Sequence, residues 1–192
     1  MNKPFNIIIA GVGGQGVITL TQIIAEAALI EGRDIKTSEL HGLSQKGGSV
    51  QTHIRFGKKI YSPLIAEGKA DLILGLEIIE GLRKINYANS ETSFLMNEHF
   101  LPYPGSPSEQ EIKKMISQKI KGKKYVISAS KICQEKLGKE ILSGVYLLGF
   151  AAYNKIIPLK PKSFLKAIEN SVSQKYLDIN IKAFKLSKSC KK

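Results

Sequence analysis

The chain has 192 residues, of which 43% are hydrophobic, and its formal net charge is +13. That length suffices for one domain with a proper core, and no apolar run approaches the ~20 residues of a membrane-spanning helix. The N-terminus lacks the features of a secretory signal peptide, so we expect a cytoplasmic protein. The two cysteines, Cys133 and Cys190, are too few for an iron–sulfur cluster or a structural zinc site, and we expect reduced, inert thiols.

The positive charge favours an anionic partner, such as a nucleic acid, an acidic protein or a phosphorylated small molecule. The lysines are densest at 113–114, 119–124 and 185–192. No RNA- or DNA-binding motif accompanies them, so a solvated lysine surface is favoured over a nucleic-acid face.

The stretch from Phe5 to Leu20, FNIIIAGVGGQGVITL, predicts a strand, a glycine-rich loop and a helix that continues to about Ile30. The loop satisfies G-x-G-x-x-G, a pattern that brings backbone N–H groups to a phosphate at a helix N-terminus. A tight turn that binds nothing is the alternative. The candidate ligand or interface contacts in this loop are Gly11, Gly13, Gly14, Gln15 and Gly16.

A second short strand is predicted from Asp34 to Glu39. Glu39 lies about twenty residues beyond Gly16, where a dinucleotide-binding domain places a carboxylate for a ribose hydroxyl. This spacing adds a second weak indication of NAD binding.

A second polar, glycine-rich loop, LHGLSQKGGS, follows at 40–49. Because ligands bind at the carboxyl edge of an open α/β sheet, we expect both glycine loops to lie at that edge. A loop shaped only for subunit packing is the alternative. Together with Glu39, the candidate site residues here are His41, Gly42, Ser44, Gln45, Lys46, Gly47 and Gly48.

The alternation from Val50 to Phe56 predicts a half-exposed strand that forms a hairpin with 60–62. We expect His53 to be a surface or hydrogen-bonded strand residue, and Arg55 to be available to a phosphate or a partner carboxylate.

The remaining pattern predicts alternating strands and helices. Glu77 and Glu80 stand at the start of a helix, where capping and the helix dipole explain them more simply than acid–base chemistry does. The apolar helix at 145–153 is either core or a partner-covered surface. Strands are expected at 70–76, 92–96 and 124–128, and helices at 77–85, 108–120, 129–137, 143–153, 163–171 and 174–187.

These elements predict a single Rossmann-like α/β domain over residues 1–187. We expect a mostly parallel sheet with helices on both faces and one hairpin insertion, followed by a basic tail at 188–192 that frays from Ser189.

Three segments, GVGGQG, ELHGLSQKGGSVQTHIRFG and ADLILGLEIIEGLR, resemble the gamma-type subunits of 2-oxoacid:ferredoxin oxidoreductases, and within that family the small subunits of the indolepyruvate type. The resemblance extends from Phe5 to Leu186, and the loop from His41 to Val50 is its most specific part. Lys46 stands where the family usually has arginine, which keeps the charge but loses the bidentate fork.

The resemblance implies a mechanism divided between chains. A larger subunit binds thiamine diphosphate and four-iron clusters, coenzyme A accepts the acyl group, carbon dioxide leaves, and ferredoxin takes the electrons. The present chain, by that resemblance, binds no cofactor alone, contributes no catalytic residue or metal ligand, and uses its glycine loops to line the coenzyme A or active-site cleft. Pyruvate, a branched-chain 2-oxoacid or 2-oxoglutarate are alternative substrates to indolepyruvate, and a stand-alone NAD(P)- or flavin-binding reductase is the alternative of another class.

Overall fold

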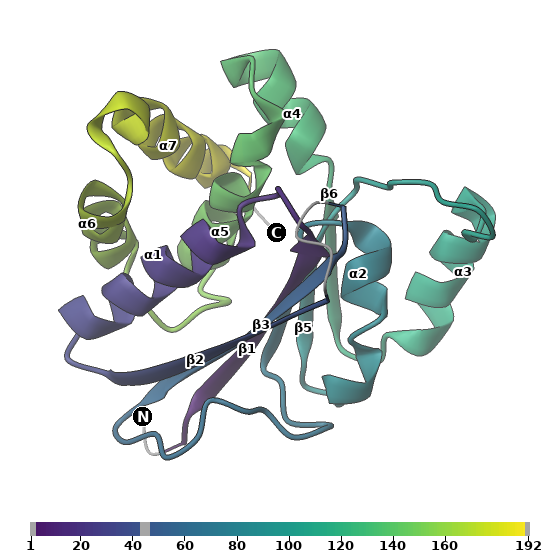
Figure 1. Cartoon of the computed structure of the whole chain (residues 1–192), viewed down its shortest axis with the longest axis horizontal. Coiled ribbons are helices and arrows are strands. Elements are labelled where there is room, and N and C mark those ends of the chain that lie inside the picture. Colours follow the sequence, from purple (N-terminus) through teal and green to yellow (C-terminus); the bar gives the residue numbers. More distant parts are fainter. Residues whose placement is uncertain (1–2, 43–46, 191–192) are drawn as a thin grey trace.

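The computed structural model describes residues 3–42 and 47–190. These residues contain a six-stranded sheet in the order β2-β3-β1-β4-β5-β6 (Figure 1). Strands β1, β4, β5 and β6 run parallel, whereas β3 is antiparallel to both of its neighbours, β1 and β2. The strands are β1 (Phe5–Val12), β2 (Asp34–His41), β3 (Ser49–Gly57), β4 (Leu72–Gly75), β5 (Ser93–Asn97) and β6 (Lys123–Ile127).

Helices cover both faces of the sheet, which confirms the predicted α/β class (Figure 1). One face carries α1 (Val17–Ile30), α5 (Ser143–Tyr153), α6 (Pro161–Ser171) and α7 (Gln174–Leu186). The other carries α2 (Ile78–Leu82) and α3 (Glu109–Lys119). The remaining segments are α4 (Ala129–Leu137) and three 3₁₀ turns, η1 (Ile85–Tyr87), η2 (Glu140–Leu142) and η3 (Ser187–Ser189).

The central strand β1 joins two hydrophobic cores. Ile7 and Ile9 are fully buried in the core beneath α1 and α5, and Ile8 is fully buried in the core beneath α2 and α3. Helix α5 is buried from Ser143 to Ala152 within this chain, so core packing accounts for its apolar sequence. Of the two interpretations of that helix, core burial is the one observed.

The hairpin differs from the prediction. It joins β2 to β3 through the second glycine loop, and residues 60–62 form no strand. The half-exposed assignment of β3 is also wrong, because the strand lies between β1 and β2 and buries Gln51, Thr52 and His53. Alternation suggested an exposed face because Gln51 and His53 are polar, but both are hydrogen-bonded in the interior.

Local signals set the element ends. Ser108 and Glu111 form a reciprocal capping box at the start of α3. At the C-terminus, Ser187–Ser189 form η3, and the Cys190 carbonyl accepts a hydrogen bond of 3.2 Å from the Asn154 side chain, while fraying of the tail stays a prediction. Residues 191–192 lie outside the described residues.

Candidate functional site at the carboxyl edge of β1

The two glycine loops meet at one edge of the sheet. Because β1 and β3 are antiparallel neighbours, the end of β1 at Val12 lies opposite the start of β3 at Ser49. The Gly13 N–H donates to the Gly48 carbonyl at 2.8 Å, and the Gly47 N–H donates to the Gly13 carbonyl at 3.4 Å. The prediction that both loops share an edge is therefore confirmed for their described residues.

The first loop depends on glycine at two positions. Gly14 and Gly16 have φ angles of 103° and 80°, in the left-handed region that favours glycine. Gly16 is the N-cap of α1 and has no side chain to cap the helix. The Gln15 side chain instead closes the loop, because its Oε1 accepts a 2.8 Å hydrogen bond from the Val12 N–H.

Gly11 has a different role from the other glycines. It lies within β1, and a Cβ atom there would stand 2.8 Å from Gln15 Oε1 and 3.1 Å from Leu76 Cβ. This glycine therefore permits close packing between the strand and the loop.

The structure leaves part of the second loop untested. Gly42, Gly47 and Gly48 are described, and β2 ends at His41. The candidate residues Ser44, Gln45 and Lys46 lie outside the described residues. Their role in the site stays a prediction.

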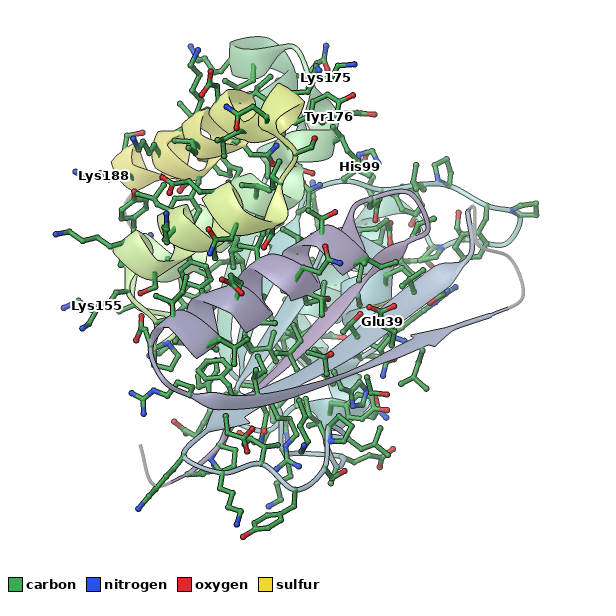
Figure 2. The ribbon with its side chains drawn as sticks, turned by 60° about the vertical axis from the view of Figure 1, so that its left-hand side comes forward. Glu39, His99, Lys155, Lys175, Tyr176 and Lys188 are labelled. Atoms are coloured by element: carbon green, nitrogen blue, oxygen red, sulfur yellow. The ribbon has the colours of Figure 1, made fainter. Side chains whose placement is uncertain are left out.

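Glu39 does not occupy the position expected in a dinucleotide site. Such a site draws its carboxylate from the strand next to β1, whereas here β3 lies between β1 and β2. Glu39 is exposed on β2, opposite Thr52 of β3, and Figure 2 shows it well away from Tyr176 and Lys175. The topology therefore weakens the argument for NAD.

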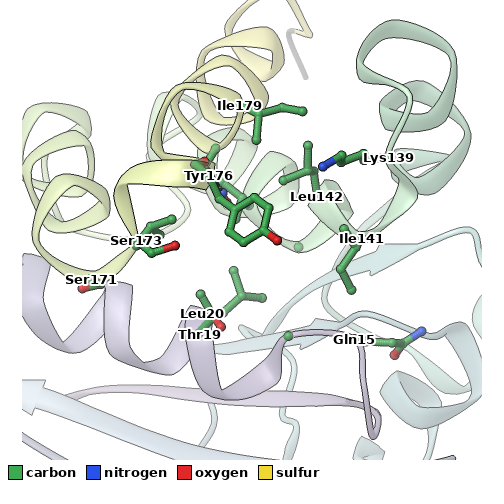
Figure 3. Close-up of a pocket in the computed structure, with 15 residues that line it drawn as sticks. Gln15, Thr19, Leu20, Lys139, Ile141, Leu142, Ser171, Ser173, Tyr176 and Ile179 are labelled. Atoms are coloured by element: carbon green, nitrogen blue, oxygen red, sulfur yellow. Dashed lines mark hydrogen bonds between the residues drawn. The ribbon is translucent and has the colours of Figure 1, made fainter.

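A cavity of about 480 Å³ opens beside the first glycine loop (Figure 3). It lies between the start of α1, the start of α5 and the junction of α6 with α7. Its lining combines apolar side chains with hydroxyl, amide and amino groups, and includes Gln15, Gly16, Thr19, Leu20, Lys139, Ile141, Leu142, Ser171, Ser173, Tyr176 and Asn180.

The electrostatics of this cavity suit an anion. Lys139 and Lys175 each place Nζ close to the Tyr176 ring, at 5.3 and 5.4 Å from its centroid. The amino ends of α1 and α7 lie at the cavity, and their N-cap residues, Gly16 and Ser173, make no side-chain cap bond. Among the lining residues that the structure describes, none carries a carboxylate.

Sequence reasoning missed most of this cavity. It identified Gln15 and Gly16 from the glycine pattern but not Lys139, Ser173 or Tyr176. The sequence does indicate helix starts at Gly16, Ser143 and Ser173, and these could have pointed to the cavity. They lie far apart in the sequence, however, and come together only in the folded chain.

A polar network centred on the buried Glu80 side chain lies behind the second glycine loop. Ser49 Oγ donates to Glu80 Oε2 at 2.5 Å, and Arg83 Nη1 donates to Glu80 Oε1 at 2.6 Å. Arg83 Nη2 also donates to the Tyr103 hydroxyl at 3.1 Å. Glu80 is 5% exposed, so its carboxylate links the start of β3 to α2 and the loop after β5.

Glu77 performs the capping role predicted for it. Its Oε2 accepts a 2.8 Å hydrogen bond from the Glu80 N–H at the start of α2. Burial raises the pKa of the Glu77 carboxyl, against the opposing effect of backbone N–H donors. Capping therefore accounts for Glu77, while Glu80 joins the network described above.

His53 and Arg55 are engaged within the fold. His53 Nδ1 accepts a 3.0 Å hydrogen bond from the Ile65 N–H, and its Nε2 contacts the Gln51 amide. Burial, reinforced by Lys84, lowers the pKa of His53. Arg55 Nε donates to Asn6 Oδ1 at 3.0 Å and its Nη1 to two backbone carbonyls, so this guanidinium orders the loop at 62–64.

Two kinds of feature are absent from the described residues. No group of three or more His, Cys, Asp or Glu side chains there could hold a metal ion. Both thiols are free, and burial raises the pKa of Cys133 to about 11. Within residues 3–42 and 47–190, no helix is long and apolar enough to cross a bilayer.

Comparison with known proteins identifies the family. The sequence model of the pyruvate ferredoxin/flavodoxin oxidoreductase family matches residues 6–189. The chain belongs to this family. Indolepyruvate oxidoreductase subunit IorB of Pyrococcus horikoshii is 37% identical over 96% of this chain and 94% of its own length. The corresponding IorB of Thermococcus kodakarensis is 35% identical over the same shares of the two chains.

More distant members and solved structures agree with this assignment. Pyruvate synthase subunit PorC of Methanocaldococcus jannaschii is 26% identical over 90% of this chain and 89% of its own. The structure of pyruvate oxidoreductase subunit PORC from Thermotoga maritima has the same fold, with a TM-score of 0.73 at 20% identity over 97% of this chain and 96% of that one. The resemblance to small subunits of 2-oxoacid:ferredoxin oxidoreductases, inferred from the sequence, is confirmed.

Proposed function

We propose that this chain is the small subunit of an indolepyruvate-type 2-oxoacid:ferredoxin oxidoreductase. The observation that carries the proposal is the graded similarity within the family. Identity is 31–37% to the IorB subunits and 25–27% to subunits that serve pyruvate or ketoisovalerate. The reaction would be the coenzyme A-dependent oxidative decarboxylation of indolepyruvate and related arylpyruvates, with ferredoxin as electron acceptor.

In this proposal the redox chemistry resides on a larger partner subunit. Thiamine diphosphate and four-iron clusters there would supply decarboxylation and electron transfer. The family likeness supports that division.

The task proposed for this chain is to bind and orient coenzyme A. The cavity beside α1 offers Lys139 and helix amino ends without side-chain caps to phosphate groups, and apolar walls at Leu20 and Leu142 to the uncharged part of the molecule. A solved structure that contains this fold, 2-oxoglutarate:ferredoxin oxidoreductase from Magnetococcus marinus, has coenzyme A and succinyl-CoA bound. The chain spans about a third of that protein, with a TM-score of 0.75 at 20% identity.

The two glycine loops would complete the cleft against the larger subunit. Backbone hydrogen bonds from Gly13 to Gly48 and from Gly47 to Gly13 hold the described ends of the two loops together. We propose that Gln45 and Lys46, which lie outside the described residues, contribute polar groups to this cleft.

The test is anaerobic purification of the chain from its native host, followed by a visible spectrum and a substrate panel. We expect a brown complex with a larger protein that reduces ferredoxin with indolepyruvate and coenzyme A. A kcat/KM for pyruvate or 2-oxoglutarate that exceeds the value for indolepyruvate would replace the substrate but keep the subunit assignment. A colourless chain that purifies alone, and that binds NADH or a flavin, would overturn both.

A further inference from the structure

A second hollow lies at the β6 side of the sheet, on the face that α2 and α3 cover. A groove of about 690 Å³ separates α3 from β6. Its lining includes apolar groups from both walls, among them Ile112 and Ile116 of α3 and Val126 of β6. Val126 is 39% exposed although it stands opposite the buried Met96 of β5.

The strand that borders this groove, β6, is an edge strand of the sheet formed by the described residues. In the sheet order β6 comes last, and it pairs with β5 alone. The Ile127 carbonyl accepts a 2.8 Å hydrogen bond from the Glu98 N–H, so the backbone groups of Ile127 face the β5 side. Because successive residues of a strand alternate, the backbone N–H and C=O groups of Lys124 and Val126 point away from the sheet.

The same two residues place their side chains in the groove. Lys124 and Val126 both line it, so one edge offers backbone hydrogen bonds and a side-chain pocket together. An added strand needs this combination, with backbone pairing for affinity and a pocket for alternate side chains. The other edge strand, β2, borders neither of the two cavities described.

The charges around the groove select its occupant. Lys113, Lys121, Lys123 and Lys124 are exposed on α3, on β6 and between them. Two carboxylates, Glu98 and Glu109, line the other part of the groove, and Glu98 accepts a hydrogen bond from Ser128. If β6 paired with β6 of a second copy of this chain, the lysines of the two strands would face and repel one another, which disfavours self-pairing.

We propose that β6 accepts an acidic, extended segment of another protein as an added strand, with an apolar side chain of that segment seated between α3 and β6. The segment hydrogen-bonds to the backbone of Lys124 and Val126. Its carboxylates face the lysines of β6 and the adjoining turn. The inference concerns a surface apart from the coenzyme A cleft, so it stands or falls independently of the function proposed above.

The test uses synthetic peptides of about six residues, the usual strand length, and the full chain. One peptide alternates Glu and Val, one has the same composition in two blocks, and one alternates Lys and Val. We expect fluorescence anisotropy to show binding of the alternating Glu/Val peptide at least tenfold tighter than of either other peptide. Hydrogen exchange should slow at the Lys124 and Val126 amides when it binds.

Val126→Pro removes the outward N–H at an edge position where proline is sterically tolerated, and Val126→Thr is the matched control that keeps it. We expect the proline variant to lose peptide binding and the threonine variant to retain it, with circular dichroism verifying that both fold. If the proline variant does not fold, the double variant Lys123→Glu and Lys124→Glu tests the proposal instead. We expect this variant to bind the Lys/Val peptide more tightly than the Glu/Val peptide.

Four results would overturn the proposal. The first is that the Glu/Val peptide does not bind at concentrations up to about 1 mM, and the second is that the block peptide binds equally well. The third is that neither the proline variant nor the double charge reversal changes peptide binding. The fourth is that the chain associates with itself and that the proline variant abolishes this association. The second would mean attraction by charge alone, and the fourth would make another copy of this chain the occupant.

Discussion

The cavity beside α1 and the polar network behind the second glycine loop lie around the same edge of the sheet, yet their polar groups are arranged differently. In the network, Ser49, Glu80 and Arg83 satisfy one another at 2.5 and 2.6 Å. In the cavity, the Lys139 side chain contacts only the face of the Tyr176 ring among the interactions described, and the amino ends of α1 and α7 lack side-chain caps.

The difference indicates that the network stabilises the fold, whereas the cavity is available to a ligand. Glu80 is buried, and a buried carboxylate without hydrogen-bond partners costs free energy, so Ser49 and Arg83 satisfy it within the folded chain and thereby hold the start of β3 against α2. The cavity is open to solvent, where uncompensated positive charge is tolerated and remains available to an anion. Substitutions in the network should therefore act on stability first, and substitutions in the cavity on ligand binding first.

The largest expected effect follows from Glu80→Leu. The change leaves Ser49 without its acceptor and Arg83 without its ion pair, and should lower the free energy of unfolding by about 2 kcal/mol. Urea denaturation measures it. Glu80→Gln is the matched control, because the amide keeps the shape and an oxygen acceptor and should recover part of the loss.

A double-mutant cycle sharpens this prediction. If Ser49 and Glu80 act as one unit, Ser49→Ala combined with Glu80→Leu should cost less than the sum of the single changes. Strict additivity would show that Ser49 and Glu80 contribute independently, and the proposed link between the loop and α2 would fail.

Lys139→Glu should produce the next effect, on the ligand rather than on the fold. Reversal of the charge in the cavity should raise the KM for coenzyme A about tenfold in the assembled enzyme, equivalent to roughly 1.4 kcal/mol of binding free energy. The melting temperature should move by no more than about 2 °C, because Lys139 is exposed and the only described partner of its side chain is the Tyr176 ring.

Lys131→Glu makes the same charge change on exposed α4 without lining the cavity. Equal increases in KM for the two variants would assign the effect to the overall field of the protein. A raised KM for Lys139→Glu alone supports local binding at the cavity.

The sequence predicted the α/β class and several element bounds because strong local signals coincide there. The helical pattern from Val17 to Ile30 and the strand before Gly13 agree with the structure, since apolar periodicity and the glycine turn point the same way. The meeting of the two glycine loops followed from a general rule of sheet edges.

The errors have a common physical cause. Gln51 and His53 look like surface residues in a one-dimensional pattern, and only the tertiary contacts to Ile65 and Tyr87 show that they are buried. The position of β3 between β1 and β2 was likewise invisible, because a glycine-rich connection reads equally well as a ligand loop or as a hairpin turn. The cavity was missed since its walls come from three distant segments.

The smallest expected effect is the pH dependence of stability that the buried His53 side chain causes. The pKa of His53 in the folded state lies below its ordinary value of 6.5, because burial and the Lys84 charge both oppose the charged ring. Nδ1 also accepts the Ile65 N–H, which requires the neutral ring. As the pH falls through about 6.5, His53 takes up a proton in the unfolded state but not yet in the folded state, so the free energy of unfolding decreases as the pH is lowered.

The measurement is urea denaturation between about pH 8 and pH 6, for the natural chain and for His53→Asn. Asparagine can place Oδ1 near the position of Nδ1 and does not titrate, so the variant should have a flatter pH dependence over this range. Glu77 acts in the opposite direction, because its raised pKa makes the folded state the better proton acceptor as pH falls. Subtraction of the two curves removes the contribution of Glu77, and identical slopes would show that the His53 ring ionises as freely in the folded chain as in the unfolded one.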